Sequence, residues 1–498
     1  MQFFIAGYCP PLPTQKPEKR GLPPAATMSK NKFGIYGKRV LTPQGVQEGV
    51  VVVENGTISG VMPRGDVPSG IEIIDAGNHV VMPGLVDSHV HVNEPGRTHW
   101  EGFTTATQAA AAGGITTIAD MPLNSDPVTT TLDAFKIKRE STDGKLFVDC
   151  AFFGGVVPGN CDQLVPLIDA GVVGFKCFLI HSGIDDFPNV TEADLHIAMP
   201  ILARHKIPLL VHAELEHMHE SGLAPAGTSG TVAAGASPLP QWTDPRSYAS
   251  FLQSRPRRWE DDAINLMIGL CKQYECPVHI VHLSSADCVN EIKQAALKLP
   301  FTVETCPHYL TFAAEEIPDG DTRFKCAPPI RERENREKLW AALKDGTIKI
   351  VVSDHSPCAP DLKHIPEGDL KNAWGGVSSL QFRLSAVWTE ASKRGFSLSQ
   401  ISDWLSVQPA QFLGLGDRKG KLAAGYDADI ILFDPDAPAV FKGDNILHRH
   451  KVTPYEGRQM RGVIHSTYLR GQKIYETGKV AEQPLGAAIL RKPARIQV

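Results

Sequence analysis

The sequence lacks the features that mark membrane-spanning, nucleic-acid-binding and disulfide-rich proteins. None of its apolar runs approaches the roughly 18–20 residues that a transmembrane helix needs. There is no block of basic residues, and 50 Lys and Arg against 55 Asp and Glu give a net charge of −5. This balance argues against a nucleic-acid groove or a surface for anionic membranes. We therefore expect neither nucleic acid nor membrane as a partner.

The sequence also lacks cysteines in the close CxxC spacing. The ten cysteines are scattered through 498 residues without a CxxC pair, which favours free thiols in a reducing compartment. We expect an intracellular protein, with the cytoplasm favoured over the endoplasmic reticulum or the peroxisome. Residues 1–30 are rich in proline, and their apolar stretch Phe3–Ala6 has no basic residue before it. This segment is predicted to be a disordered extension instead of a signal peptide, and Met28 is an alternative start.

The composition indicates many turns and a globular core. Gly and Pro together make about 16% of the chain, against roughly 12% on average, and 42% of the residues are hydrophobic. Eight apolar segments alternate with helical stretches, as in βα units around a parallel sheet. The predicted strands are Val80–His91, Ile115–Met121, Phe147–Phe153, Val172–Phe178, Pro208–His212, Val278–His282, Phe301–Thr305 and Ile348–Asp354. The fold class is therefore α/β, a (β/α)₈ TIM-like barrel.

Short strands with hairpin turns flank the barrel on both sides. Each of these β segments is too small to bury a core alone. We expect them to combine into one small β-sandwich domain, with the barrel inserted between the two ends of the chain. The predicted boundaries are 31–82 and 419–480 for the sandwich, 83–418 for the barrel and 481–498 for a C-terminal tail.

Polar side chains gather at the carboxyl ends of the predicted strands. His89 and His91 are two residues apart and would present two imidazoles on one strand face. On spacing alone, such a pair is more often structural than metal-binding. A TIM barrel, however, builds its active site at these strand ends. Six residues share this position, which favours a common site: His89, His91, Lys176, His212, His282 and Asp354.

These residues lie in motifs that resemble the amidohydrolase superfamily of binuclear metal hydrolases and, within it, the cyclic amidohydrolases. The resemblance runs from about Phe33 to about Tyr475. The shared motifs are Pro83–His91, Gly113–Thr117, the strand-four Lys176, Ser353–His355 and Gly425–Asp429.

The resemblance implies a ligand set and a mechanism. His89, His91 and Asp354 would bind one divalent ion, and His212 and His282 the other. Lys176 would react with CO₂ to an N6-carboxylysine that bridges both ions. Zinc is favoured, with manganese, cobalt or iron as alternatives. A bridging hydroxide would attack a ring amide, and Asp354 would be the catalytic proton shuttle.

Further motifs resemble those of the allantoinases among the cyclic amidohydrolases. They are Glu94–Gly102, Asp120–Asn124, Glu304–Tyr309, Phe324–Arg331, Ala373–Gly376 and His448–Tyr455, with Ala327 where Ser is common. The implied reaction is hydrolytic opening of the hydantoin ring of (S)-allantoin to allantoate in purine and ureide catabolism, by a homotetramer. Dihydroorotases carry Arg and Asn where Asn93 and Leu123 stand here, so a carboxylate substrate would lose its partners. Asn93, Ser356, Asn372 and Gly376 are candidate substrate contacts.

Two alternatives differ in substrate or in class. A dihydropyrimidinase or hydantoinase would typically carry a Tyr after strand three, where Phe152–Gly155 stands, and a different strand-four end from Cys177–Ile180. A metal-free scaffold protein of the same superfamily would lack several ligands, and all six positions are filled here.

Overall fold

The barrel predicted from the sequence is present in the computed structural model, which describes residues 32–216 and 242–491. The expected N-terminal extension, residues 1–30, lies outside these ranges. Each barrel strand pairs in parallel with its neighbours. Val90 pairs with His355, just beyond the last strand, and this bridge closes the barrel. The strands are β6 (Leu85–Val90), β7 (Ile115–Asp120), β8 (Asp149–Phe152) continued by β9 (Gly154–Gly155), β10 (Phe175–Phe178), β11 (Leu209–His212), β12 (Val278–Ile280), β13 (Phe301–Thr305) and β14 (Ile350–Val351).

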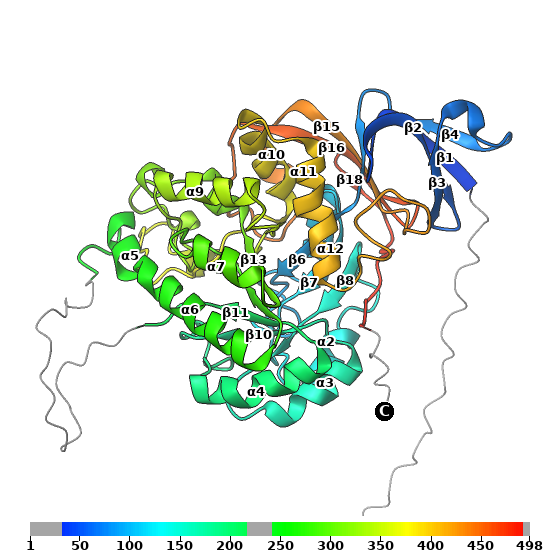
Figure 1. The fold of residues 1–498 in the computed structure, drawn as a ribbon. Coiled ribbons are helices and arrows are strands. Elements are labelled where there is room, and N and C mark those ends of the chain that lie inside the picture. The colour runs from blue at the N-terminus through cyan, green and yellow to red at the C-terminus, as the bar shows by residue number, and fades with distance from the viewer. Residues whose placement is uncertain (1–31, 217–241, 492–498) are drawn as a thin grey trace, which may run out of the picture.

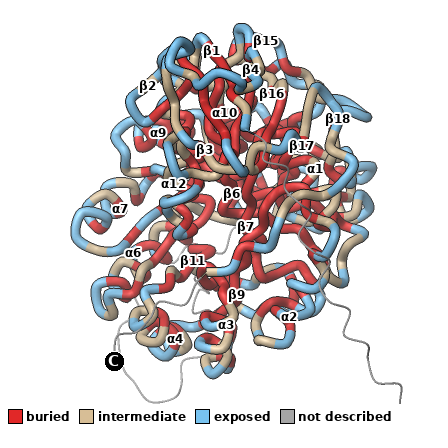
Figure 2. Tube along the Cα trace, turned by 90° about the vertical axis from the view of Figure 1, so that its right-hand side faces the viewer, coloured by how far each residue is buried: buried red, intermediate tan, exposed pale blue. Residues whose placement is uncertain are grey.

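Helices surround these strands and alternate with them along the chain (Figure 1). The strands are buried and the outer faces of the helices are exposed (Figure 2). None of the helices in the described ranges is long and apolar enough to cross a bilayer. The α-helices are α1 (Phe103–Ala112), α2 (Leu132–Glu140), α3 (Leu164–Ala170), α4 (Glu192–His205), α5 (Tyr248–Ser254), α6 (Arg257–Tyr274), α7 (Val289–Ala296), α8 (Pro307–Thr311), α9 (Arg333–Lys344), α10 (Arg383–Lys393), α11 (Leu398–Ser402) and α12 (Gln408–Phe412). Short 3₁₀ turns are η1 (Arg64–Asp66), η2 (Cys161–Gln163), η3 (Ala314–Glu316), η4 (Thr322–Phe324), η5 (Pro360–Lys363), η6 (Leu380–Phe382) and η8 (Gly443–Asn445), and η7 (Asp403–Val407) is a π-helical turn.

Both ends of the chain contribute to a second sheet, as expected. Its strands are β1 (Lys32–Thr42), β2 (Gly45–Glu54), β3 (Thr57–Met62), β4 (Glu72–Asp75), β5 (Val80–Pro83), β15 (Ile430–Ala439), β16 (Met460–Leu469), β17 (Gln472–Glu476) and β18 (Lys479–Val480). β5 pairs with β1 on one side and with β15 on the other, so hydrogen bonding continues from the N-terminal strands to the C-terminal ones. The nine strands therefore form one connected sheet. Residues from both ends, among them Val40, Ile58 and Ile430, share its core.

The predicted strand Val80–His91 divides at Gly84. Residues before it belong to the second sheet, and residues after it begin the barrel. A side chain at Gly84 would come within 2.5 Å of Thr116, so this crossing between the two sheets requires a glycine.

Buried ion pairs fasten the second sheet to the amino ends of the barrel strands. Lys419 lies 2.9 Å from Asp149 of β8 and 2.7 Å from Asp429, and Arg470 also pairs with Asp149. The first residues of the predicted tail lie here too, because Cys150 donates its backbone N–H to Ala487 and Ile489 donates back to Cys150. The candidate functional site lies at the opposite, carboxyl end of the barrel.

Candidate metal centre

The six side chains predicted as metal ligands converge at the carboxyl end of the barrel. His89 lies on β6 and His91 directly follows it, and their Nε2 atoms lie 3.3 and 3.6 Å from Oδ1 of Asp354. His212 ends β11, and its Nδ1 lies 3.1 Å from Nε2 of His282. The rings of His89 and His282 are 5.5 Å apart, so the two groups face each other across the barrel axis.

Three of these residues stand beyond the strands in which the sequence placed them: His91 directly follows β6, and His282 and Asp354 lie further past β12 and β14. β12 ends at Ile280 and β14 at Val351, whereas the predicted strands reach His282 and Asp354. The reason is backbone geometry, since His282 and Asp354 have φ of 40° and 45°, in the left-handed region that a strand does not allow.

Lys176 on β10 lies between the two groups and has an unusual environment. It is 1% exposed, and its Nζ has no hydrogen-bond partner. Burial lowers the pKa of Lys176 to about 8, because the attraction of Asp354 and Glu304 offsets the desolvation only in part. A buried ammonium without a partner is costly, whereas a neutral amine can react with CO₂.

The protonation states of the other side chains also favour cation binding. Burial lowers the pKa of His91 to about 4 and also lowers the pKa values of His212 and His282, so these imidazoles are neutral. Burial alone would raise the pKa of Asp354, but His89 and His91 hold it well below its ordinary value. Neutral imidazoles and a carboxylate are the donors that zinc and similar ions take.

Two glutamates behind the ligands fix the orientation of the imidazoles. Oε1 of Glu304, on β13, accepts from Nδ1 of His89 at 2.6 Å, which leaves Nε2 of that ring facing the site without a hydrogen-bond partner. Oε2 of Glu214 lies 2.7 Å from Nε2 of His212, so Nδ1 faces the site. Carboxylate–histidine pairs of this kind typically orient metal ligands. Sequence reasoning missed both glutamates, although Glu214 stands two residues after His212.

The cavity above these ligands is small and mixed in character. Asn124 lines this cavity, and its Nδ2 lies 3.4 Å from Nδ1 of His91. Other lining residues are Leu123, Lys176, Phe178, Ser182, Cys326, Ala327, Asp354, Ser356, Trp374, Gly375 and Gly376. Sequence reasoning did not single out Asn124, Ser182 or Trp374 as contacts, although Asn124 and Trp374 lie in motifs that it noted.

Of the four candidate substrate contacts, the structure brings two to this cavity. Ser356 donates to Oδ1 of Asp354 at 3.0 Å, and Gly376 lies beside it. Asn93 is buried and donates to the carbonyl of Pro357, and Asn372 is exposed and bonds Asp369. Neither Asn93 nor Asn372 lines the cavity formed by the described residues.

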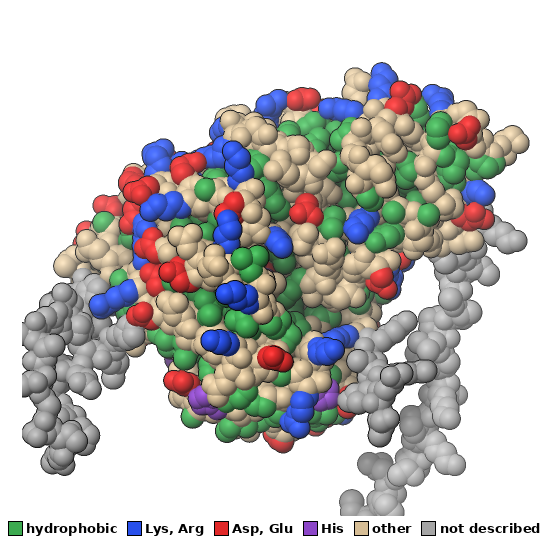
Figure 3. All heavy atoms as spheres, viewed as in Figure 1, with side chains coloured by type: hydrophobic (Ala, Val, Ile, Leu, Met, Phe, Trp, Pro, Cys, Tyr) green, Lys and Arg blue, Asp and Glu red, His purple; other side chains and the backbone are tan. Residues whose placement is uncertain are grey.

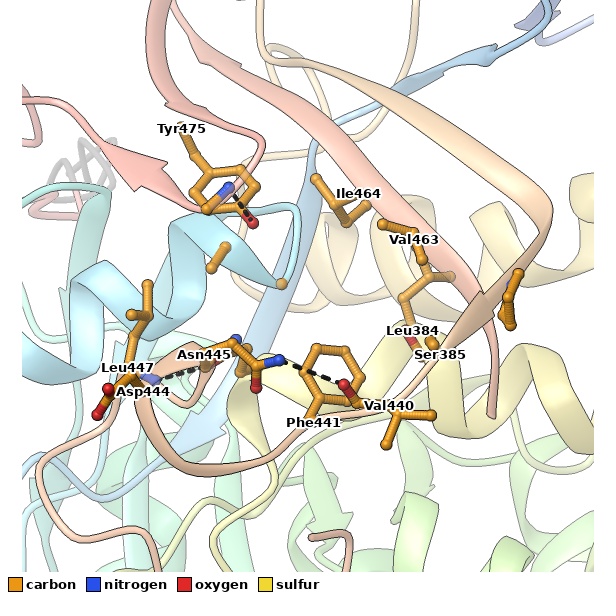
Figure 4. Close-up of a pocket in the computed structure, with 16 residues that line it drawn as sticks. Leu384, Ser385, Val440, Phe441, Asp444, Asn445, Leu447, Val463, Ile464 and Tyr475 are labelled. Carbon is orange, nitrogen blue, oxygen red and sulfur yellow. Dashed lines mark hydrogen bonds between the residues drawn. The ribbon is translucent and has the colours of Figure 1, made fainter. Parts of the chain in front are cut away.

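A different hollow lies between the second sheet and α1 and α10 (Figure 4). Leu384, Phe441, Val463 and Ile464 supply apolar walls, and Asp444 is the one acidic residue among the described residues that line it. No histidine or cysteine of those ranges lines it. This hollow therefore lacks the donors that chemistry at a metal would require. On the face of the molecule in Figure 3, acidic and basic side chains are interspersed, in agreement with the small net charge.

A closed parallel barrel with histidines, a lysine and an aspartate at its carboxyl end defines a metal-dependent barrel hydrolase. The match to the Amidohydrolase family covers residues 80–474, and the chain belongs to that family. It is similar to an allantoinase of Streptomyces avermitilis, with 46% identity over 94% of this chain and 100% of the relative. It is 42% identical to an allantoinase of Arabidopsis thaliana over 91% of this chain and 90% of that one. Among solved structures, an L-hydantoinase (dihydropyrimidinase) from Arthrobacter aurescens has a TM-score of 0.83 and 29% identity over 92% of this chain and 99% of the other.

Proposed function

We propose that this protein hydrolyses (S)-allantoin to allantoate, by opening the hydantoin ring at an amide C–N bond. Relatives named allantoinase, 42–46% identical over about nine-tenths of the chain, support this substrate. The observation that carries the chemistry is the convergence of four histidines, Asp354 and the partnerless Lys176 at one end of the barrel.

The residues fit a pair of divalent ions. Nε2 of His89 and Nζ of Lys176 are buried and have no hydrogen-bond partner, and Nδ1 of His212 and Nε2 of His282 lie 3.1 Å apart. His89, His91 and Asp354 would hold one ion, and His212 and His282 the other, with an N6-carboxylated Lys176 bridging them. Zinc is the favoured metal, and manganese, cobalt or iron are alternatives. When bound, such a pair lowers the pKa of water and polarises an amide carbonyl.

The protein itself moves the proton and shapes the ring pocket. Asp354 accepts the proton of the attacking water at a carboxylate oxygen and passes it to the leaving ring nitrogen. Its low pKa keeps it ionised at neutral pH, as a base must be. Ser356 holds Oδ1 of Asp354 and thereby limits its rotation. Phe178 and Trp374 line the cavity and provide flat apolar walls for a planar ring.

Leu123 disfavours substrates that carry a carboxylate. It lines the cavity, and no arginine does so among the described residues. A substrate carboxylate would therefore be desolvated without a bidentate partner. We expect uncharged hydantoin-type rings to be preferred over dihydroorotate.

The test is a comparison of allantoin, hydantoin, dihydrouracil and dihydroorotate on metal-reconstituted protein. The expected result is the highest kcat/KM for allantoin, with dihydroorotate at least about tenfold lower. A preference for dihydrouracil or hydantoin would instead assign the dihydropyrimidinase or hydantoinase activity. Protein that retains no metal after dialysis and turns over none of these rings would favour the metal-free scaffold alternative.

Two features of the cellular protein complete the proposal. The homotetramer rests on the resemblance to the cyclic amidohydrolases, and sedimentation analysis tests it. A reducing compartment such as the cytoplasm is supported by the nine cysteines of the described ranges, all of which are unpaired.

A further inference from the structure

A cysteine and a histidine outside the predicted ligand set lie next to Asp354. β13 ends at Thr305, Cys306 precedes α8, and His308 is in the first turn of that helix. One donor atom from each of Cys306, His308 and Asp354 lies within 4.8 Å of the other two. All three residues are buried.

His308 shows that this cluster is incompletely satisfied. The residue is 0% exposed, yet neither of its ring nitrogens has a hydrogen-bond partner. Buried polar groups in folded proteins are nearly always paired, so an orphaned imidazole beside a thiol and a carboxylate points to a missing ligand.

We propose that Cys306, His308 and Asp354 form an additional, inhibitory binding site for one soft divalent cation such as Zn²⁺ or Cd²⁺. Sulfur, imidazole nitrogen and carboxylate oxygen are the donor types of tetrahedral zinc sites, and a fourth position is left for water. The thiolate selects soft ions and discriminates against Mg²⁺ and Ca²⁺.

Binding at this site changes protonation and bonding in a simple way. The Cys306 thiol releases one proton to solvent, and a sulfur–metal bond forms as His308 and Asp354 donate electron pairs. No oxidant or reductant is required. The cluster adjoins the cavity through Asp354, which lines the cavity and belongs to the cluster.

The inhibitory effect rests on the proposed function, in which Asp354 carries the proton. A carboxylate oxygen held by the additional cation cannot accept that proton, so turnover falls while the two catalytic ions stay bound. The binding itself does not depend on that function and can be measured without substrate.

A spectroscopic titration isolates the site. The proposed catalytic ligands include no sulfur, so a thiolate-to-Cd²⁺ absorption band in the ultraviolet reports only on binding to a cysteine. Holoenzyme titrated with Cd²⁺ in thiol-free buffer is expected to show this band together with a third metal ion per chain. Cys306→Ser should abolish the band, and His308→Gln should weaken Cd²⁺ affinity at this site by more than about tenfold.

Two other cysteines provide matched controls. Cys161 is the one cysteine of the described ranges that is not fully buried, and Cys326 lines the catalytic cavity without belonging to the cluster. Cys161→Ser and Cys326→Ser should keep the band. If Cys306→Ser fails to fold, Cys306→Ala serves as the second variant, with circular dichroism confirming the fold.

Inhibition completes the test. Excess Cd²⁺ or Zn²⁺ should inhibit the unmutated enzyme, and Cys306→Ser should raise the inhibitory concentration by more than about tenfold relative to its own uninhibited rate. A band that survives Cys306→Ser, or a titration that ends at two ions without a band, overturns the site. A band without inhibition overturns the role assigned to Asp354 and leaves the cation site standing.

Discussion

The two halves of the metal centre are supported in different ways. His89, His91 and Asp354 stand on the closing seam of the barrel, and the carboxylate behind them, Glu304, belongs to a barrel strand. His212 ends β11, His282 lies just after β12, and Glu214 behind them is held by Arg255.

The supporting carboxylates show the difference most clearly. Glu304 bridges two histidines, with Oε1 2.6 Å from Nδ1 of His89 and Oε2 3.0 Å from Nε2 of His279, and all three side chains are fully buried. Glu214 instead accepts from Nε of Arg255 at 3.0 Å, and the Arg255 side chain is 22% exposed and immediately follows α5. One half is therefore fixed by the barrel core, and the other by a residue outside the barrel strands. This comparison predicts that the two ions respond separately to substitutions behind them.

Lys176 is the residue that should affect both halves at once, and its replacement should have the largest effect. Lys176→Ala removes the group proposed to bridge the ions, so we expect fewer than two metals per chain. Turnover should fall by at least about a hundredfold, because each ion contributes several kcal/mol to the transition state. Elemental analysis with steady-state kinetics measures both.

Chemical rescue supplies the control for this variant. A short carboxylic acid offers two oxygens that can replace a carbamate, so its addition should partly restore activity. Unmutated protein refolded with metal should likewise gain activity when bicarbonate is supplied. Two metals per chain with normal turnover in Lys176→Ala would show that the lysine is only structural.

Asp354→Asn tests the catalytic step within the first half. An amide retains an oxygen donor for the metal but cannot accept the proton, so the fold and most of the metal should remain. Turnover should fall to less than about a tenth of the unmutated rate. Stopped-flow or steady-state kinetics beside metal analysis decides the point, and a higher residual rate would remove the shuttle role.

Glu304→Gln and Glu214→Gln form a matched pair that addresses each half in turn. A glutamine has one side-chain oxygen, so Glu304→Gln can present an oxygen to His89 or to His279 but not to both. We expect about a tenfold to hundredfold weaker binding of one ion, with the other unchanged. Chelator competition should show a single weakened step in each variant. Equal loss of both ions in either variant would contradict the separate support of the two halves.

Much of this arrangement could be predicted from the sequence because its signals are local. Apolar runs that end in His89, Lys176 or His212 identify strands and the side chains at their carboxyl ends, and a barrel brings all such ends together. The division at Gly84 was not predictable from hydrophobic pattern, because apolar residues flank Gly84 on both sides and both parts of the segment are buried.

The missed features depend on contacts between distant segments. Glu304 lies 215 positions from His89, and Arg255 lies 41 positions from Glu214, so spacing along the chain carries no signal for either pair. The left-handed turns at His282 and Asp354 were missed because neither residue is a glycine that would mark such a turn. Asn372 was proposed from its loop, but the path of that loop leaves its side chain bonded to Asp369 in solvent.

The smallest expected effect is that of Arg255→Met, which acts on the second half through Glu214. Burial raises the pKa of Glu214, and Arg255 together with His212 holds it well below the ordinary value in the unmutated protein. Without the guanidinium, burial is less opposed and the carboxyl takes up a proton at higher pH. A protonated Glu214 orients His212 poorly, so the bound second ion is present above the new pKa and lost as pH falls through it. We expect the pH below which the second ion is lost, the acid limb of metal binding, to be higher in this variant, with about tenfold weaker affinity for that ion near the limb.

Metal content measured across a pH series is the readout for Arg255→Met. Arg257→Met is the matched control, because Arg257 pairs with Asp287 and Glu332. An acid limb that stays in place in Arg255→Met would show that Glu214 is held by the barrel alone, and the contrast between the two halves would be lost.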